Sequence, residues 1–183
     1  MIQIRLFLRR VSRSWGRMRP RWRLLIGALF IALIGMGGLT PKYIFGAEIV
    51  WPYMGLIAAI GWGRSGLALG PMVFLLLFGF ADDVSQAPWG SHGFANLLTY
   101  GLSALVFQTF DVERNPVLNL SLPLACLLVG VVLIWLMASV SLGQPARAAP
   151  LISAYFATVL VQIATAPLFD LGVRRALQGG RRV

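Results

Sequence analysis

The sequence has very few of the residues from which enzyme and metal sites are usually built. Its 183 residues include one cysteine, Cys126, one histidine, His92, and six acidic residues. A single cysteine cannot form an internal disulfide, and one cysteine with one histidine cannot complete a closed zinc site. Ser91 directly precedes His92, the wrong arrangement for a nucleophile and a base that must meet across space. We therefore expect no enzymatic activity, no bound metal and no cofactor.

Charge is scarce as well, and most of it has one sign. Charged residues make up 12% of the chain and hydrophobic residues 58%, whereas soluble domains contain about 25% and about 45–50%. The formal net charge is nevertheless +10, because 16 basic residues, 15 of them arginine, outnumber the acidic ones. Eight arginines lie within residues 5–23 and four within residues 174–182. A hydrophobic middle between basic ends predicts an integral membrane protein, with no nucleic-acid partner.

Six hydrophobic stretches are each close to the roughly 20 residues that an α-helix needs to cross about 30 Å of hydrocarbon. They cover residues 24–40, 44–62, 65–81, 94–110, 120–142 and 148–171. Apolar and polar residues do not alternate strictly, so strands are not expected. The first stretch lacks a convincing signal-peptide cleavage site, and we expect it to remain in the protein. The sequence thus predicts an all-α integral membrane protein, a polytopic bundle of about six transmembrane helices.

The positions of the basic residues predict how this bundle is oriented. With both termini in the cytoplasm, 14 of the 16 basic residues lie inside and only Lys42 and Arg147 lie outside, as the positive-inside bias requires. Residues 1–23 form an Arg-rich cytoplasmic arm, residues 24–171 the transmembrane domain and residues 172–183 a basic cytoplasmic tail. The arm interleaves arginine with apolar residues, which suits an anionic lipid surface; it could also dock a partner or only fix the topology.

The acidic residues are expected mostly at solvated helix ends or in local pairs. Asp82 and Asp83 close the third stretch at the outer face, ahead of a long outer loop over residues 82–93, and Asp170 closes the sixth stretch at the inner face. An aspartyl protease needs two carboxylates that share one water, but these ends lie about 30 Å apart. We expect Asp170 to pair instead with Arg174, four residues further on.

Polar side chains recur at helical spacing on two of the stretches. Asn96, Thr99 and Ser103 share one face of the fourth stretch. Thr158, Gln162 and Thr165 share one face of the sixth. Such stripes are typical of internal helix packing in membranes, with a ligand cavity or a partner groove as the alternatives. A glycine pair four residues apart, at positions 66 and 70, predicts a close helix contact on the third stretch.

Three blocks of sequence resemble the MreD family, the small polytopic rod-shape-determining proteins of bacteria. The central block, residues 78–90, reads FGFADDVSQAPWG and is similar to the family's glycine–apolar–Asp–apolar pattern followed by Pro-x-Gly. In that pattern the family aspartate is either Asp82 or Asp83. The second block begins at Trp51-Pro52 and ends at Trp62 and Arg64; it carries Tyr53 where the family usually has aspartate. The third, residues 165–169, precedes the Arg-rich tail.

The resemblance implies a non-enzymatic scaffold of the cell-elongation machinery in the bacterial inner membrane. Implied partners are MreC and, directly or through MreC, the MreB filament, the RodA glycosyltransferase and a class B penicillin-binding protein. The alternative is the substrate-binding membrane subunit of a small-solute transporter of the vitamin type, in which Asn96, Thr99, Gln162 or Thr165 would contact the solute. The candidate partner contacts are Trp51, Pro52, Arg64, Gly79, Asp82, Asp83, Pro88, Gly90, Asn96, Thr99, Gln162 and Pro167.

Overall fold

The fold is almost entirely helical. A computed structural model describes residue 15 and residues 18–39, 43–44, 47–48, 51–86, 89–110, 112 and 115–171. The helices are α2 (Pro20–Gly35), α3 (Met54–Gly63), α4 (Leu69–Gln86), α5 (Ser91–Thr109), α6 (Pro116–Leu142) and α7 (Ala148–Thr165). Short 3₁₀ turns follow α2 and α7, η1 (Met36–Leu39) and η2 (Ala166–Phe169). The strands β1 (Tyr43–Ile44) and β2 (Ala47–Glu48) form a small antiparallel hairpin.

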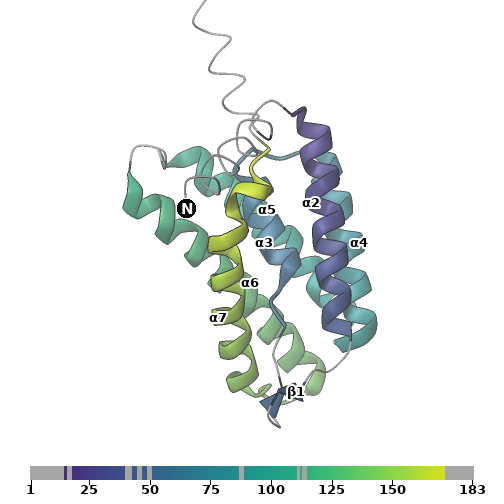
Figure 1. Cartoon of the computed structure of the whole chain (residues 1–183). Helices are drawn as coiled ribbons and strands as arrows, with labels where there is room; N and C mark the ends of the chain where they lie inside the picture. Colours follow the sequence, from purple (N-terminus) through teal and green to yellow (C-terminus); the bar gives the residue numbers. More distant parts are fainter. Residues whose placement is uncertain are drawn as a thin grey trace, which may run out of the picture.

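The helices run alongside one another with α3 and α5 in the middle of the bundle (Figure 1). Helix α5 packs against α3, α4 and α6, while α2 and α7 lie against other sides of α3. The start of α2 and the end of η2 meet at one end of the bundle, where the Arg23 guanidinium donates to the Asp170 carbonyl at 3.1 Å. The hairpin and the α6–α7 turn lie at the opposite end (Figure 1). The chain therefore begins α2 at one end of the bundle and turns from α6 to α7 at the other.

Helix α3 is the buried axis of the molecule and differs most from its prediction. All ten of its residues are buried, so it contacts neighbouring helices on every side. At 1.5 Å per residue it extends about 15 Å, half of what a crossing needs. A continuous helix over residues 44–62 was therefore wrong: the short hairpin and the non-helical residues 51–53 come before the helix.

The turn between α4 and α5 is also shorter than expected. Helix α4 continues to Gln86 and α5 begins at Ser91, which corrects the predicted outer loop over residues 82–93. Gly66 has a φ of +94° and lies in the turn before α4. The predicted pairing of glycines 66 and 70 on one helix is therefore wrong.

Two of the described helices are long and apolar enough to cross a membrane. Helix α6 has 27 residues and contains an 18-residue stretch with a mean hydropathy of 2.6, and α7 has 18 residues with a mean hydropathy of 1.6. The α6 helix begins cleanly because the Asn115 side chain accepts from the backbone N–H groups of Val117 and Leu118, the pattern of an N-cap. It ends at Gly143, whose φ is +62°. The all-helical class is confirmed apart from the hairpin, and α6 and α7 are consistent with membrane association.

Candidate functional site

The segment Trp51–Tyr53 crosses the bundle in a non-helical conformation and is fixed on two sides. The Trp51 indole Nε1 donates to the Ile34 carbonyl of α2 at 2.9 Å. The Tyr53 backbone N–H donates to Thr158 Oγ1 of α7, also at 2.9 Å. Pro52 has no N–H to satisfy and disfavours a helical conformation for the residue before it. Pro52 and these two hydrogen bonds together account for the start of α3 at Met54, inside the bundle.

Asp83 is the organising residue of the neighbouring α4–α5 turn. Its side chain accepts at 2.8 Å from the Gly90 N–H and at 2.9 Å from both the Ser91 hydroxyl and the His92 N–H. His92 Nδ1 lies 2.7 Å from Asp83 Oδ1. A carboxylate at a helix N-terminus satisfies free N–H groups and interacts favourably with the helix dipole. Because Asp83 is only 2% exposed, the expectation of a solvated helix end was wrong for it.

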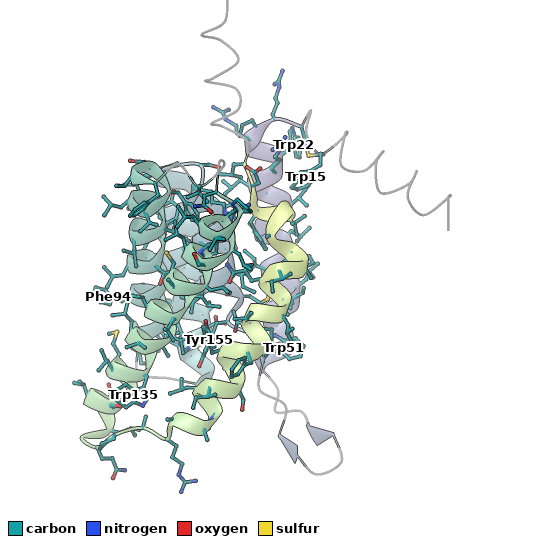
Figure 2. All side chains as sticks on the ribbon, turned by 90° about the vertical axis from the view of Figure 1, so that its left-hand side faces the viewer. Trp15, Trp22, Trp51, Phe94, Trp135 and Tyr155 are labelled. Atoms are coloured by element: carbon teal, nitrogen blue, oxygen red, sulfur yellow. The ribbon has the colours of Figure 1, made fainter. Side chains whose placement is uncertain are left out.

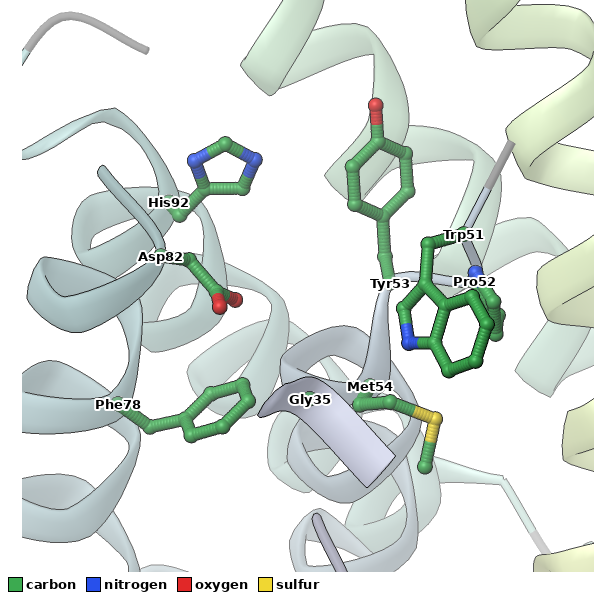
Figure 3. A pocket seen from close by; sticks show the side chains of 8 residues that line it. All are labelled: Gly35, Trp51, Pro52, Tyr53, Met54, Phe78, Asp82 and His92. Atoms are coloured by element: carbon green, nitrogen blue, oxygen red, sulfur yellow. The ribbon is translucent and has the colours of Figure 1, made fainter. Parts of the chain in front are cut away.

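Asp82 faces the start of α3 rather than the α5 cap. A cavity of about 30 Å³ is lined by Gly35 of α2, residues 51–54, Phe78, Asp82 and His92. Figure 3 shows the Asp82 carboxylate directed into the space between α4 and the segment Trp51–Tyr53. The Tyr53 and His92 rings are 5.7 Å apart. A polar cavity of this size is sufficient for one or two water molecules.

The backbones of α4 and α5 touch beside this cavity. A Cβ built on Gly79 would collide with the Gly93 backbone and lie 2.7 Å from the His92 carbonyl carbon. The two helices can approach this closely because Gly79 and Gly93 have no side chains. The close contact places Asp82 and Asp83 next to the residues they face. Gly90, with a φ of +92°, makes the turn before α5. Gly79 and Gly90 therefore have structural reasons to be glycine in the pattern that resembles MreD.

The polar stripe of α5 packs inside the bundle, as the internal-packing interpretation of that pattern predicts. Asn96 Nδ2 donates to the Leu75 carbonyl at 3.4 Å, and the Ser103 hydroxyl lies 3.2 Å from the Ala59 carbonyl. A Cβ on Gly55 would lie 2.7 Å from Asn96 Oδ1. Thr99 is fully buried, and its hydroxyl has no hydrogen-bond partner among the described residues. The stripe on α7 behaves similarly, because Thr158 holds Tyr53 and Gln162 is buried.

The second and third of the three blocks meet at the opposite end of α3. The Trp62 ring packs edge-on against Phe169, with centroids 6.1 Å apart, and Gly61 faces the same ring. Arg64 Nη2 donates to the Asn119 carbonyl at 3.3 Å. Burial lowers the pKa of the Arg64 guanidinium, and the nearby Asp170 opposes this shift only in part. This end is distant from Asp82. Arg23 of α2 contacts Asp170 at this end, whereas Gly35 of α2 lines the cavity at Asp82. Gly35 lies twelve residues after Arg23, a separation of about 18 Å along a helix.

Some predicted residues cannot be placed. Pro88 and Arg174 lie outside the described residues, as does most of the Arg-rich arm; Pro167 lies in η2, but its side chain is likewise outside them. Within the described part of the chain, no group of three or more His, Cys, Asp or Glu could hold a metal ion.

Sequence reasoning missed the roles of Tyr53 and His92. For His92 the sequence contained one indication. Asp83 lies seven residues before Gly90-Ser91, where α5 begins, and aspartate and serine are residues that cap helix N-termini. Tyr53 had none, because its importance depends on contacts with α5 and α7.

No protein-family profile, curated protein or solved structure matches the chain.

Proposed function

We propose that this chain is a multi-pass scaffold of the bacterial inner membrane, similar to MreD, that acts without catalysis in cell elongation. It would connect MreC and the peptidoglycan synthesis proteins, RodA and a class B penicillin-binding protein, to the MreB filament. The observation that carries this proposal is spatial. The three blocks that resemble MreD are separated in sequence, yet they meet at the two ends of α3: Pro52 and Asp82 line one cavity, and Trp62 packs on Phe169.

The membrane placement is supported by the bundle and by its charges. Helices α6 and α7 meet the length and hydropathy of crossings. We infer that α2, α4, α5 and the α3 segment complete six crossings, with the start of α2 and the end of η2 facing the cytoplasm. The basic ends then lie where the positive-inside bias puts them. Arg19 and Arg21 are exposed at the start of α2, where anionic lipid would meet them.

We assign to MreC the surface around Trp89 in the α4–α5 turn, which we call the outer corner of the bundle. Trp89 is 77% exposed in the turn that Asp83 fixes. A large, exposed aromatic side chain has the character of an interface hot spot. Of the partner contacts proposed from the sequence, Asp83 and Gly90 would then act indirectly by holding this turn in place, whereas Asp82 lines the cavity beside α3.

Co-purification combined with depletion tests the proposal. Depleting the protein from its rod-shaped bacterium should produce round cells, and a tagged copy should recover MreC from detergent-solubilised membranes. Trp89→Ala should reduce this recovery; Val140→Ala, which removes an equally exposed side chain from α6, should not. Normal rods after clean deletion would overturn the scaffold.

The transporter alternative makes a different prediction. A small solute that survives purification and contacts Asn96 or Thr99 would favour a substrate-binding subunit. Both residues are buried within the helix packing, and neither lines the cavity at Asp82.

A further inference from the structure

Helices α6 and α7 diverge to leave a groove that the proposed function does not use. Its volume is about 430 Å³, and it is lined by residues 128–135 of α6 and 148–156 of α7. Val131 forms part of the floor at 5% exposure, while Leu128, Ile152 and Phe156 are more than half exposed along the walls. The lining side chains are all apolar or aromatic, which indicates an apolar occupant.

The two polar side-chain atoms in the lining are both bonded within the protein. Trp135 Nε1 donates to the Ala146 carbonyl at 2.9 Å, and the Tyr155 hydroxyl donates to the Leu124 carbonyl at 3.5 Å. Figure 2 shows Trp135 near the end of the bundle and Tyr155 nearer its middle. The groove therefore offers no polar group to an occupant along its length, and any polar contact must come at its mouth.

A basic residue lies next to the end of the groove that Ala148 lines. Arg147 is exposed, immediately precedes the lining residue Ala148, and makes no ion pair with any described carboxylate. No side chain caps the α7 N-terminus at Arg147, so the positive end of the helix dipole adds to the arginine charge. An apolar groove with an exposed arginine next to one of its end residues is complementary to a lipid that has a phosphate head and a hydrocarbon tail.

The length of the groove distinguishes an acyl chain from a partner helix. Residues 148–156 extend about 12 Å along α7, less than half of the roughly 30 Å that a crossing helix would need to contact. Tightly packed membrane helices also require small residues at their contact, whereas only Ala148 is small here. The groove thus matches one leaflet and a slender, flexible chain.

We propose that the α6–α7 groove binds one acyl chain of an outer-leaflet phospholipid whose phosphate is held by Arg147. This rests on the proposed membrane orientation but is independent of any elongation partner. Bound lipid would fill the space between the two helices and keep their outer ends at a fixed separation.

Native mass spectrometry of the full chain in mild detergent tests the proposal. The probes are phosphatidylglycerol and a diacylglycerol with the same chains but no phosphate. We expect one tightly bound phosphatidylglycerol per chain, and about tenfold weaker binding for Ile152→Trp, which fills the groove. Ile163→Trp is the matched control, because Ile163 lies on the same helix at 58% exposure against 55% for Ile152; it should bind as the wild type does.

The headgroup is tested separately. Arg147→Gln should weaken phosphatidylglycerol binding about tenfold, since one charge-assisted contact is lost, and leave diacylglycerol binding unchanged. Arg19→Gln, at the other end of the bundle, should change neither.

Equal binding by Ile152→Trp and Ile163→Trp would overturn the proposal. So would a photo-crosslinker at position 152 that captures a protein instead of lipid in membranes. If the wild-type chain binds lipid but does not bind MreC, only the proposed scaffold function is overturned.

Discussion

The buried Asp83 carboxylate and the buried His92 imidazole lie 2.7 Å apart where α4 meets the start of α5. The same carboxylate accepts from Gly90 and Ser91, so one side chain determines how α5 begins. This turn carries the exposed Trp89 and adjoins the cavity at Asp82. The stability of the turn and the proposed contact with MreC therefore depend on the same residue.

Replacement of Asp83 should destabilise the protein more than replacement of its neighbour. Asp83→Ala leaves buried donors of residues 90–92 without a partner, and we expect a loss of about 2–4 kcal/mol in unfolding free energy. Asp83→Asn keeps an acceptor for the cap and should lose less. The measurement is thermal unfolding in detergent, followed by tryptophan fluorescence.

Asp82→Asn is the comparison, because Asp82 is only partly buried. A larger loss for Asp82→Asn than for Asp83→Ala would contradict the capping role.

Gly79 should tolerate no side chain. A methyl group in Gly79→Ala meets the backbone of Gly93, and separating α4 from α5 should cost about 1–3 kcal/mol. Gly101→Ala provides the control, since a Cβ there has nothing within 4 Å and alanine is the better helix former. Unfolding curves of the two variants should move in opposite directions; matching shifts would refute the close helix crossing.

Thr158 should be replaceable by serine but not by valine. Its hydroxyl accepts from the Tyr53 N–H, so Thr158→Val leaves that group unpaired at a cost of about 1–3 kcal/mol. Thr158→Ser keeps the hydroxyl and should retain most of the stability. Thr165→Val is the matched control because the Thr165 hydroxyl donates only to the Val161 carbonyl within its own helix. Equal losses in the two valine variants would argue against a specific hold on the extended segment.

The orientation of the bundle is testable by cysteine labelling in a Cys126→Ser background. Single cysteines replacing Trp89 or Gln144 should react with a membrane-impermeant maleimide in intact cells, because both turns face outward in the proposed topology. Asn115→Cys, at the exposed start of α6, should react only after the cells are opened. The reverse pattern would invert the orientation, and labelling of all three in intact cells would refute the crossings.

The sequence was informative about helices and weak on their ends. Hydropathy located α5 and α6 within four residues of their observed bounds, because long apolar runs have few alternatives. The start of α3 at Met54 could not be read in this way, since residues 44–50 are as apolar as a helix requires. Tertiary bonds from Trp51 and Tyr53 to α2 and α7 determine that boundary.

The candidate site was predicted by resemblance, but its geometry was not. The order of Gly79, Asp82 and Gly90 in the block that resembles MreD indicated a turn of interest. The different roles of the two adjacent aspartates depend on a rotation of about 100° along α4. That rotation directs Asp83 to the α5 cap and Asp82 to the cavity beside α3.

The central claim, that the outer corner of this membrane bundle contacts MreC, is tested most directly by photo-crosslinking in living cells. A photoreactive amino acid at position 89 should yield a covalent adduct with MreC, and one at position 140 on α6, where Val140 is 81% exposed, should not. The adduct at position 89 should diminish when Asp83→Ala disrupts the turn. Adducts with MreC at neither position, or equally at both, would contradict the account.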